Sequence, residues 1–210
     1  GIYHVIIRAI DDNVIFKNVD DYYRGIFSIY EFNNTKTVSI RSRRKARASL
    51  KKFFKKNNKD PDLAADLRDK MVEVLAFSFM PNHLHLLLKQ SKDEGITRFM
   101  RKLGTGYGVY FNKKYKRKGH VFQNRFVAVP IKDEKQLKIA WAYIHVNPIS
   151  LLVPKWKEKG ISNLDKAIGF LENYKWSSYS DYIGKKNFPS VTERETFFDI
   201  LGSGRRCQEF

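Results

Sequence analysis

Cysteine is almost missing from this chain, whose single thiol, Cys207, lies in the C-terminal stretch GSGRRCQEF. One cysteine excludes an internal disulfide framework and a zinc cluster built from several thiolates. The stretch itself has the look of an expression remnant. Hydrophobic runs are also short, because none approaches the roughly 20 residues that a membrane-spanning helix needs, and no signal peptide is visible at the N-terminus. We therefore expect a cytoplasmic protein without a membrane partner.

Acidic residues are scarce relative to basic ones. The chain has 22 Asp and Glu against 40 Lys and Arg, which gives a formal net charge of +18. Such a surplus repels itself and does nothing for the fold, so it indicates a polyanionic partner, with nucleic acid favoured over an anionic membrane or solubility alone. Hydrophobic residues at 42% and aromatic residues at 14% exclude a disordered chain. A length of 210 residues favours one domain with decorations.

Hydrophobic periodicity and turn residues divide most of the chain into strands and helices. They predict strands at 3–10, 72–80, 83–90 and 120–131, and helices at 20–32, 63–70, 95–118 and 132–148. Gly104, Gly106 and Gly108 weaken the middle of one of these helices. The order strand, helix, strand, strand, helix, strand indicates an α+β fold, a ferredoxin-like split β-α-β sandwich. Its antiparallel sheet is expected to carry helices mainly on one face.

A basic segment interrupts this order at residues 33–60. Its run RSRRKARASLKKFFKKNNKD contains many basic and few acidic residues. Arg43 and Arg44 within it are candidate DNA contacts. We interpret the segment as a partly helical insertion that lies on the surface or on the partner. A solvated flexible loop is an equal alternative.

The stretch FMPNHLHLLLKQ places two histidines, His83 and His85, one residue apart in an otherwise aliphatic strand. Alternate side chains of a strand share a face, so both imidazoles project to the same side and can converge on one metal ion. A histidine pair of this kind can also be purely structural, because the pattern is short. The other histidines, His4, His120 and His145, stand alone in the sequence and are interpreted as structural.

A third ligand for such an ion can come from the helix that ends at Pro148. Tyr143 and Asn147 are four residues apart and share one face of this helix, whereas His145 faces away. A carboxamide oxygen beside two imidazoles suits Mg²⁺ or Mn²⁺ and phosphate chemistry. The alternative is equally weighted: Tyr143 belongs to a core stripe, and Asn147 ends the helix before the proline.

Four segments in register carry a resemblance to a known family. The segments FMPNHLHLLL, YFNKKYKRKGHVFQNRF, AYIHVNP and WSSYSDYIG resemble the single-tyrosine transposases of the HUH superfamily, and most closely their REP-associated tyrosine transposase branch. The resemblance runs from residue 3 to about residue 183 outside the basic segment, which has no counterpart in the family core. It implies one HUH nuclease domain over 1–183. Residues 184–210 are then a C-terminal extension, partly disordered or left over from expression.

The resemblance also implies residue roles. His83 and His85 match the metal-binding pair, Tyr143 matches the nucleophilic tyrosine, and Asn147 stands where insertion-sequence members have a glutamine ligand. The implied activity is a metal-dependent single-stranded DNA endonuclease and strand transferase that uses Mg²⁺ or Mn²⁺. The resemblance further implies a 5′-phosphotyrosine intermediate and a substrate that is hairpin DNA with a single-stranded flank. We expect a monomer or homodimer associated with a bacterial nucleoid.

The basic residues then gain a role as phosphate contacts. Besides the two arginines of the basic segment, the candidates are Arg101, Lys102, Lys113, Lys116, Arg117, Lys118 and Arg125. Tyr107, Tyr110, Phe111 and Tyr115 lie between them and could stack on unpaired bases, although helical spacing favours a core role for each. Two alternatives remain open: a non-catalytic relative that binds hairpin DNA or RNA, and a metal-dependent hydrolytic nuclease that does not need Tyr143.

Overall fold

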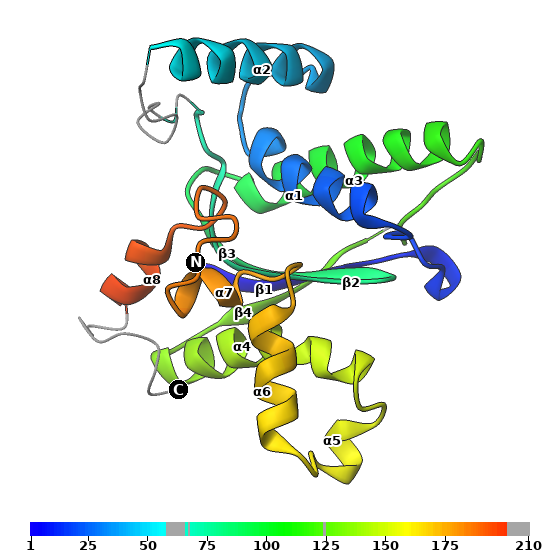
Figure 1. Ribbon diagram of the computed structural model, residues 1–210, viewed down its shortest axis with the longest axis vertical. Coiled ribbons are helices and arrows are strands. Elements are labelled where there is room, and N and C mark those ends of the chain that lie inside the picture. Colours follow the sequence, from blue (N-terminus) through cyan, green and yellow to red (C-terminus); the bar gives the residue numbers. More distant parts are fainter. Residues whose placement is uncertain (58–65, 67, 124, 201–210) are drawn as a thin grey trace.

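A computed structural model of the protein describes residues 1–57, 66, 68–123 and 125–200. Four strands form one antiparallel sheet in the order β2-β3-β1-β4. These strands are β1 (Ile2–Arg8), β2 (Val72–Met80), β3 (His83–Gln90) and β4 (Val127–Ile131). Because β3 lies between β1 and β2 and is antiparallel to both, the sheet has the split β-α-β topology of ferredoxin-like folds (Figure 1). The predicted fold class is confirmed.

Helices cover both faces of this sheet (Figure 1). α1 (Val19–Phe32) and α3 (Gly95–Lys114) pack on one face, as the expectation of helices mainly on one face requires. α4 (Glu134–Val146) packs on the opposite face, which corrects the "mainly on one face" part of that expectation. The central strand β3 is therefore buried on both sides, which explains why its sequence is a nearly continuous aliphatic run.

Close packing of α1 on α3 depends on glycine. A Cβ at Gly106 of α3 would lie 2.2 Å from the ring of Phe32 at the end of α1, so no other residue fits there without a shift of the ring. The predicted weak point in α3 is thus a contact surface, and the helix continues through it to Lys114. It ends four residues before the predicted boundary, and Lys116 just beyond it has a left-handed backbone with φ of 51°.

The remaining predicted boundaries differ in instructive ways. β2 and β3 match the predicted ranges to the residue, whereas β4 begins only at Val127. Most of the helix predicted at 63–70 lies outside the described residues, and its described positions 66 and 68–70 are not helical. The shorter elements are η1 (Ile10–Asp12), α2 (Ile40–Lys56), η3 (Asn147–Leu151), α5 (Trp156–Lys159), α6 (Leu164–Asn173), α7 (Tyr179–Tyr182) and α8 (Arg194–Ile200).

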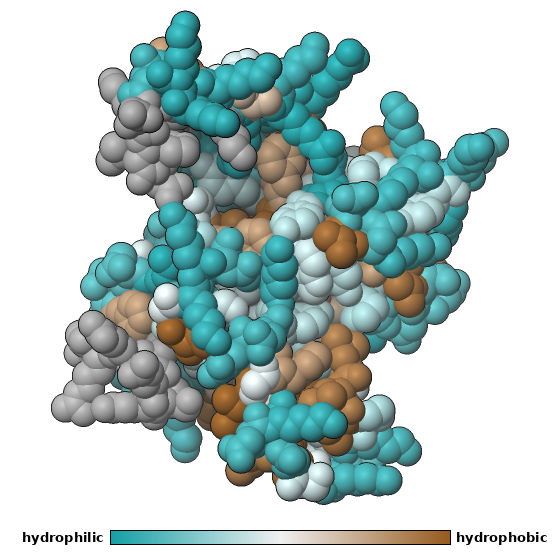
Figure 2. Space-filling view, viewed as in Figure 1, coloured by the Kyte–Doolittle hydropathy of each residue, from teal (hydrophilic) through white to brown (hydrophobic). Residues whose placement is uncertain are grey.

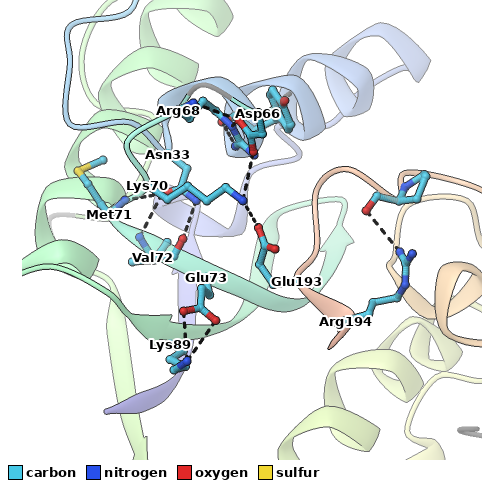
Figure 3. Close-up of polar contacts among 12 residues, drawn as sticks. Asn33, Asp66, Arg68, Lys70, Met71, Val72, Glu73, Lys89, Glu193 and Arg194 are labelled. Atoms are coloured by element: carbon cyan, nitrogen blue, oxygen red, sulfur yellow. Dashed lines mark hydrogen bonds and ion pairs between the residues drawn. The ribbon is translucent and has the colours of Figure 1, made fainter. Parts of the chain in front are cut away.

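Polar contacts fix the start of β2 (Figure 3). Asn33, directly after α1, is buried; its Oδ1 accepts from the backbone N–H groups of Met71 and Val72, at 3.0 and 3.1 Å, and its Nδ2 donates to the Val72 carbonyl at 2.7 Å. Lys70 forms an ion pair with Glu193, which lies just before α8. The end of α1, the start of β2 and the C-terminal segment are thereby held together.

The folded unit extends beyond the predicted domain end at residue 183. Phe197 of α8 is 1% exposed and packs with α4 and β2 in the second core cluster. Residues 184–200 therefore belong to the same hydrophobic unit, while 201–210, including the cysteine, lie outside the described residues. Over the part of the chain that the structure describes, no helix combines the length and the apolar character needed to cross a membrane.

Candidate active site

Two imidazoles of β3 converge on one point. His83 and His85 are 9% and 2% exposed and lie on the sheet face that α4 covers. Register fixes their surroundings, since Arg8 of β1 pairs with His83 and Ile6 pairs with His85. The Nε2 atoms of the two rings lie 3.1 Å apart. The predicted convergence of the two side chains is therefore present in the fold.

The separation of these nitrogens fits joint coordination of one ion. Two nitrogens that each lie about 2.1 Å from a metal, at angles between roughly 90° and 110°, are about 2.9–3.4 Å apart. The observed 3.1 Å falls inside that range. No cluster of three or more His, Cys, Asp or Glu suited to a metal occurs among the described residues. Any further protein ligand from that part of the chain must therefore be of another type, such as a carboxamide.

Outer partners orient the two rings. Nδ1 of His83 lies 2.6 Å from Oδ1 of Asn82, and because a carboxamide oxygen only accepts, this nitrogen carries the proton. Nδ1 of His85 lies 2.9 Å from Nε2 of His4 on β1. When His85 donates in that contact, both Nε2 atoms keep a free lone pair toward the shared point. Carboxamide and imidazole partners of this kind fix the tautomer of metal-binding histidines.

Burial keeps these imidazoles neutral. Desolvation, aided by the neighbouring cations Arg8 and Lys157 and opposed by Asp12, lowers the pKa of His83 to about 4. Desolvation and the other two imidazoles together lower the pKa of His85 to about 2. The pKa of His4 falls to about 4 through burial. Neutral imidazole is the form that binds a metal, so the site is ready for one at neutral pH.

A phenol stands beside this cluster. Tyr143 of α4 is half-buried, and its ring packs edge-on against His85 and His4, with centroid distances of 5.8 and 5.7 Å. Lys157 of α5 donates to the Tyr143 hydroxyl oxygen at 2.7 Å. The ammonium also lies 4.4 Å from the centre of the ring. The structure thus brings together a neutral imidazole pair, a phenol and a cation from three separate parts of the chain.

Asn147 follows Tyr143 by one helical turn. It begins η3 directly after α4, its residue is 7% exposed, and its backbone N–H donates to the carbonyl of Tyr143. The residues of η3 also pack near β2, the neighbour of β3 in the sheet. Asn147 is therefore a buried carboxamide at the same end of α4 as the tyrosine.

The remaining histidines separate clearly from this cluster. His145 is 1% exposed, faces away from Tyr143, and bonds through Nε2 to the Ser178 hydroxyl at 2.7 Å. His120 is exposed. His4 differs from the expectation that it stands alone: it pairs with Leu87 across the strands, and its ring meets that of His85 diagonally on the same face.

Comparison with known proteins identifies the family. Residues 45–147 match the sequence model described as "Transposase IS200 like", and this range contains the histidine pair, Tyr143 and Asn147. Over this range the chain is an IS200-like transposase. It is therefore a transposase, in agreement with the predicted recognition. A search of curated proteins finds no match.

One solved structure supports the fold of this IS200-like transposase. A REP-associated tyrosine transposase bound to a REP hairpin matches with a TM-score of 0.50 and 13% identity, covering 91% of this chain and 84% of that one. A candidate transposase from Deinococcus radiodurans R1 gives a TM-score of 0.35 and 15% identity, covering 66% and 85%. The first likeness extends the shared fold over nearly the whole chain.

The predicted DNA contacts of the IS200-like transposase fall into three groups. Six are exposed at α3 and the segment after it: Arg101, Lys113, Lys116, Arg117, Lys118 and Arg125. Lys102 instead donates to the carbonyls of residues 34, 35 and 36 at 2.5, 3.2 and 2.8 Å, so its ammonium is occupied within the fold. Arg43 and Arg44 lie on α2, on the side that faces α1.

The aromatic residues of α3 are core residues. Tyr107 and Phe111 are each 1% exposed. Tyr110 and Tyr115 donate their hydroxyls to the buried carboxylate of Asp21, at 2.8 and 2.6 Å. Of the two alternatives in the sequence, a core role therefore describes these four side chains better than a stacking surface.

Three residues of this site were missed in the sequence. Asn82 had a local signal, because it sits in the turn directly before His83 and has a short polar side chain. His4 could be found only by pairing the first strand with the histidine strand. Lys157 had no local signal, since it reaches Tyr143 across a break between two helices.

Proposed function

We propose that this protein is a metal-dependent single-stranded DNA endonuclease and strand transferase with Tyr143 as its nucleophile. The observation that carries the proposal is the packing of Tyr143 against His85, whose Nε2 lies 3.1 Å from that of His83. A REP-associated transposase of similar fold is bound to a REP hairpin, which supports hairpin DNA as the substrate class. Mg²⁺ or Mn²⁺ is the proposed cofactor, held by His83, His85 and Asn147.

The chemistry of the donor set agrees with such an ion. Two neutral imidazoles and a carboxamide leave open positions for phosphate oxygens, which suits Mg²⁺ or Mn²⁺. When bound, the ion would neutralise charge on the scissile phosphate. Asn82 and His4 hold the imidazoles in the tautomer that points their lone pairs inward.

Tyr143 then supplies the covalent step. Its oxygen forms a bond to phosphorus, the bond to the departing 3′ oxygen breaks, the phenol proton passes to solvent, and the 3′ oxygen takes up a proton from solvent. The products are a 5′-phosphotyrosyl enzyme and a free 3′-OH, so the ester energy is kept for rejoining. Lys157 donates to the same phenol oxygen and places a cation beside the reacting atom. Arg8, opposite His83, adds a cation at the edge of the site.

The test is formation of a covalent protein–DNA adduct. A labelled hairpin with a single-stranded flank is incubated with Mn²⁺ and resolved on a denaturing gel. Tyr143→Phe and His83→Ala should each abolish the adduct. Tyr23→Phe is a matched control, because Tyr23 is an exposed tyrosine that also receives a hydrogen bond from a lysine, Lys175, yet lies on α1.

Each alternative has its own outcome. Cleavage that survives Tyr143→Phe would indicate water, or another side chain, as the nucleophile and would support a hydrolytic nuclease. Tight binding without cleavage at any metal concentration would support a non-catalytic hairpin-binding protein. Loss of the adduct in Tyr23→Phe as well would contradict the assignment of Tyr143.

A further inference from the structure

Helix α2 is the most one-sided charge feature of the molecule that the proposed chemistry does not use. Its sequence IRSRRKARASLKKFFKK contains nine Lys and Arg and no acidic residue. In Figure 1 it lies apart from the sheet, beyond α1, at the far side of the molecule from α4. The same region is a hydrophilic surface in Figure 2.

One side of α2 is anchored on α1. Arg43 and Arg47 form ion pairs with Glu31, at 3.3 and 2.9 Å, and the Glu31 side chain is only 3% exposed. Arg47 also stacks over Tyr30, 4.3 Å from the ring centre. Arg44 lies 5.7 Å from the centre of the Phe27 ring. Buried carboxylate and ring contacts of this kind hold a helix in place, so these three arginines are anchors.

Another side of α2 carries a second, unpaired set of cations. At 100° per residue, five exposed side chains fall within about 100° of one another; Arg43 and Arg47 lie about 130–170° from the centre of this set, whereas Arg44 borders it. They are Arg41, Lys45, Lys52, Lys55 and Lys56. None forms an ion pair with another residue in the described part of the chain. We call these five residues the α2 basic face.

The geometry of the α2 basic face favours a duplex over a single strand. The face runs over 16 residues from Arg41 to Lys56, or about 22 Å of helix, with axial gaps of about 6, 10, 5 and 2 Å between successive charges. Single-stranded sites interleave cations with aromatic platforms, and the α2 basic face has no aromatic residue. A straight row of cations instead fits the regular phosphate line of a double helix.

A membrane surface fits this helix less well. A helix that lies in a membrane interface inserts the face opposite its charges. On α2 that side carries Arg43 and Arg47, which are ion-paired with Glu31 of α1. Leu50 and Phe53 are also exposed on that side, but they share it with these two arginines, whose contacts with α1 occupy it.

We propose that the α2 basic face binds the phosphate backbone of a double-stranded DNA stem without reading its sequence. The inference rests on the proposed function for hairpin DNA as the substrate class, and it assigns the stem to a surface outside the cleavage site. Arg43 and Arg44, which the sequence suggested as DNA contacts, hold the helix on the body of the protein. The proposed DNA contacts of α2 are the five residues of the α2 basic face.

Salt-dependent binding tests the proposal. In the Tyr143→Phe background, which prevents turnover, the combined variant Lys45→Gln, Lys52→Gln and Lys56→Gln is compared with its parent by fluorescence anisotropy from 50 to 300 mM salt. Loss of three phosphate contacts should lower the slope of log affinity against log salt by about 2.7 for a hairpin, and weaken binding on the order of 100-fold at 0.15 M. The single-stranded flank without its stem should bind equally to both.

A matched variant removes the same charge elsewhere. Lys132→Gln, Lys135→Gln and Lys166→Gln alter three exposed lysines at β4, α4 and α6, on the far side from α2. For the hairpin, the slope of log affinity against log salt in this control should stay within about one unit of the slope of its parent. Equal melting temperatures for both triple variants will show that α2 remains folded on α1.

Three results would overturn the proposal. An unchanged hairpin slope in the α2 variant removes its basis, and an equal loss on the stemless flank assigns the face to single strands. If the α2 variant no longer sediments with anionic phosphatidylserine vesicles but keeps its hairpin affinity, the α2 basic face is assigned to membranes. Adduct formation with Tyr143 restored is scored separately, so failure of the chemistry and failure of stem binding are distinguishable.

Discussion

Replacing Lys157 by methionine tests whether the cation at the phenol oxygen contributes to the chemistry. Methionine keeps an unbranched apolar stem but removes the donor that lies 2.7 Å from the Tyr143 oxygen. A hydrogen bond that involves a charged group contributes about 1.5–3 kcal/mol when it is shielded from solvent. Lys157 is exposed, so we reduce this to about 1–2 kcal/mol. The expected loss is then roughly 5- to 30-fold in the rate of adduct formation.

Single-turnover kinetics with saturating Mn²⁺ and hairpin DNA measure this loss. The rate of adduct formation should fall while the hairpin affinity changes little, because one exposed charge contributes only a small part of binding. Lys157→Arg, which keeps a cationic donor, should recover most of the rate. Lys159→Met, an exposed neighbour on the same short helix α5, should leave it unchanged. A Lys157→Met rate equal to that of the Lys159→Met control would refute a role for this contact.

Three further predictions follow from the same structure. Asn82→Ala and His4→Ala should each weaken Mn²⁺ binding by about 10- to 100-fold with all proposed ligands present, measured by calorimetry; unchanged affinity contradicts their role as orienting partners. Burial lowers the pKa of His83 to about 4 in the folded protein, whereas the ordinary pKa of a histidine is about 6.5. At a pH between these two values, unfolding therefore takes up a proton. The metal-free protein should thus lose stability as the pH falls from 6.5 toward 4, whereas a melting temperature independent of pH over this range would oppose it. Asn33→Ala leaves three buried backbone groups unpaired and should cost about 3 kcal/mol, lowering the melting temperature by roughly 6–12 °C; a shift below about 2 °C would show that water replaces the side chain.

Much of the fold could be predicted because local patterns and burial agree. The ranges of β2 and β3 were predicted to the residue, since two largely apolar runs are separated by turn residues at 81 and 82. Helices α1 and α4 begin after Asn18 and Asp133, whose side chains accept from backbone N–H groups in the first turn. The limits of β4 and α3 were less accurate, because they depend on pairing with β1 and on the left-handed backbone at Lys116.

The placement of the basic residues shows the limit of composition as a guide. A count of charges cannot distinguish an arginine that pairs with a buried carboxylate from one that faces solvent. Arg43 meets Glu31 and Lys102 meets three carbonyl groups only because α1, α2 and α3 come together in the fold. Both were predicted as DNA contacts from sequence alone.

The sequence by itself determined the strand that carries His83 and His85, because alternation along a strand puts both side chains on one face. It likewise determined the helical spacing of Tyr143 and Asn147. Only the tertiary structure decided that His4 lies against His85 and that Lys157 reaches the phenol. These contacts join residues that are 81 and 14 positions apart, and no local pattern encodes a contact that depends on sheet register and on the path of the chain after α4.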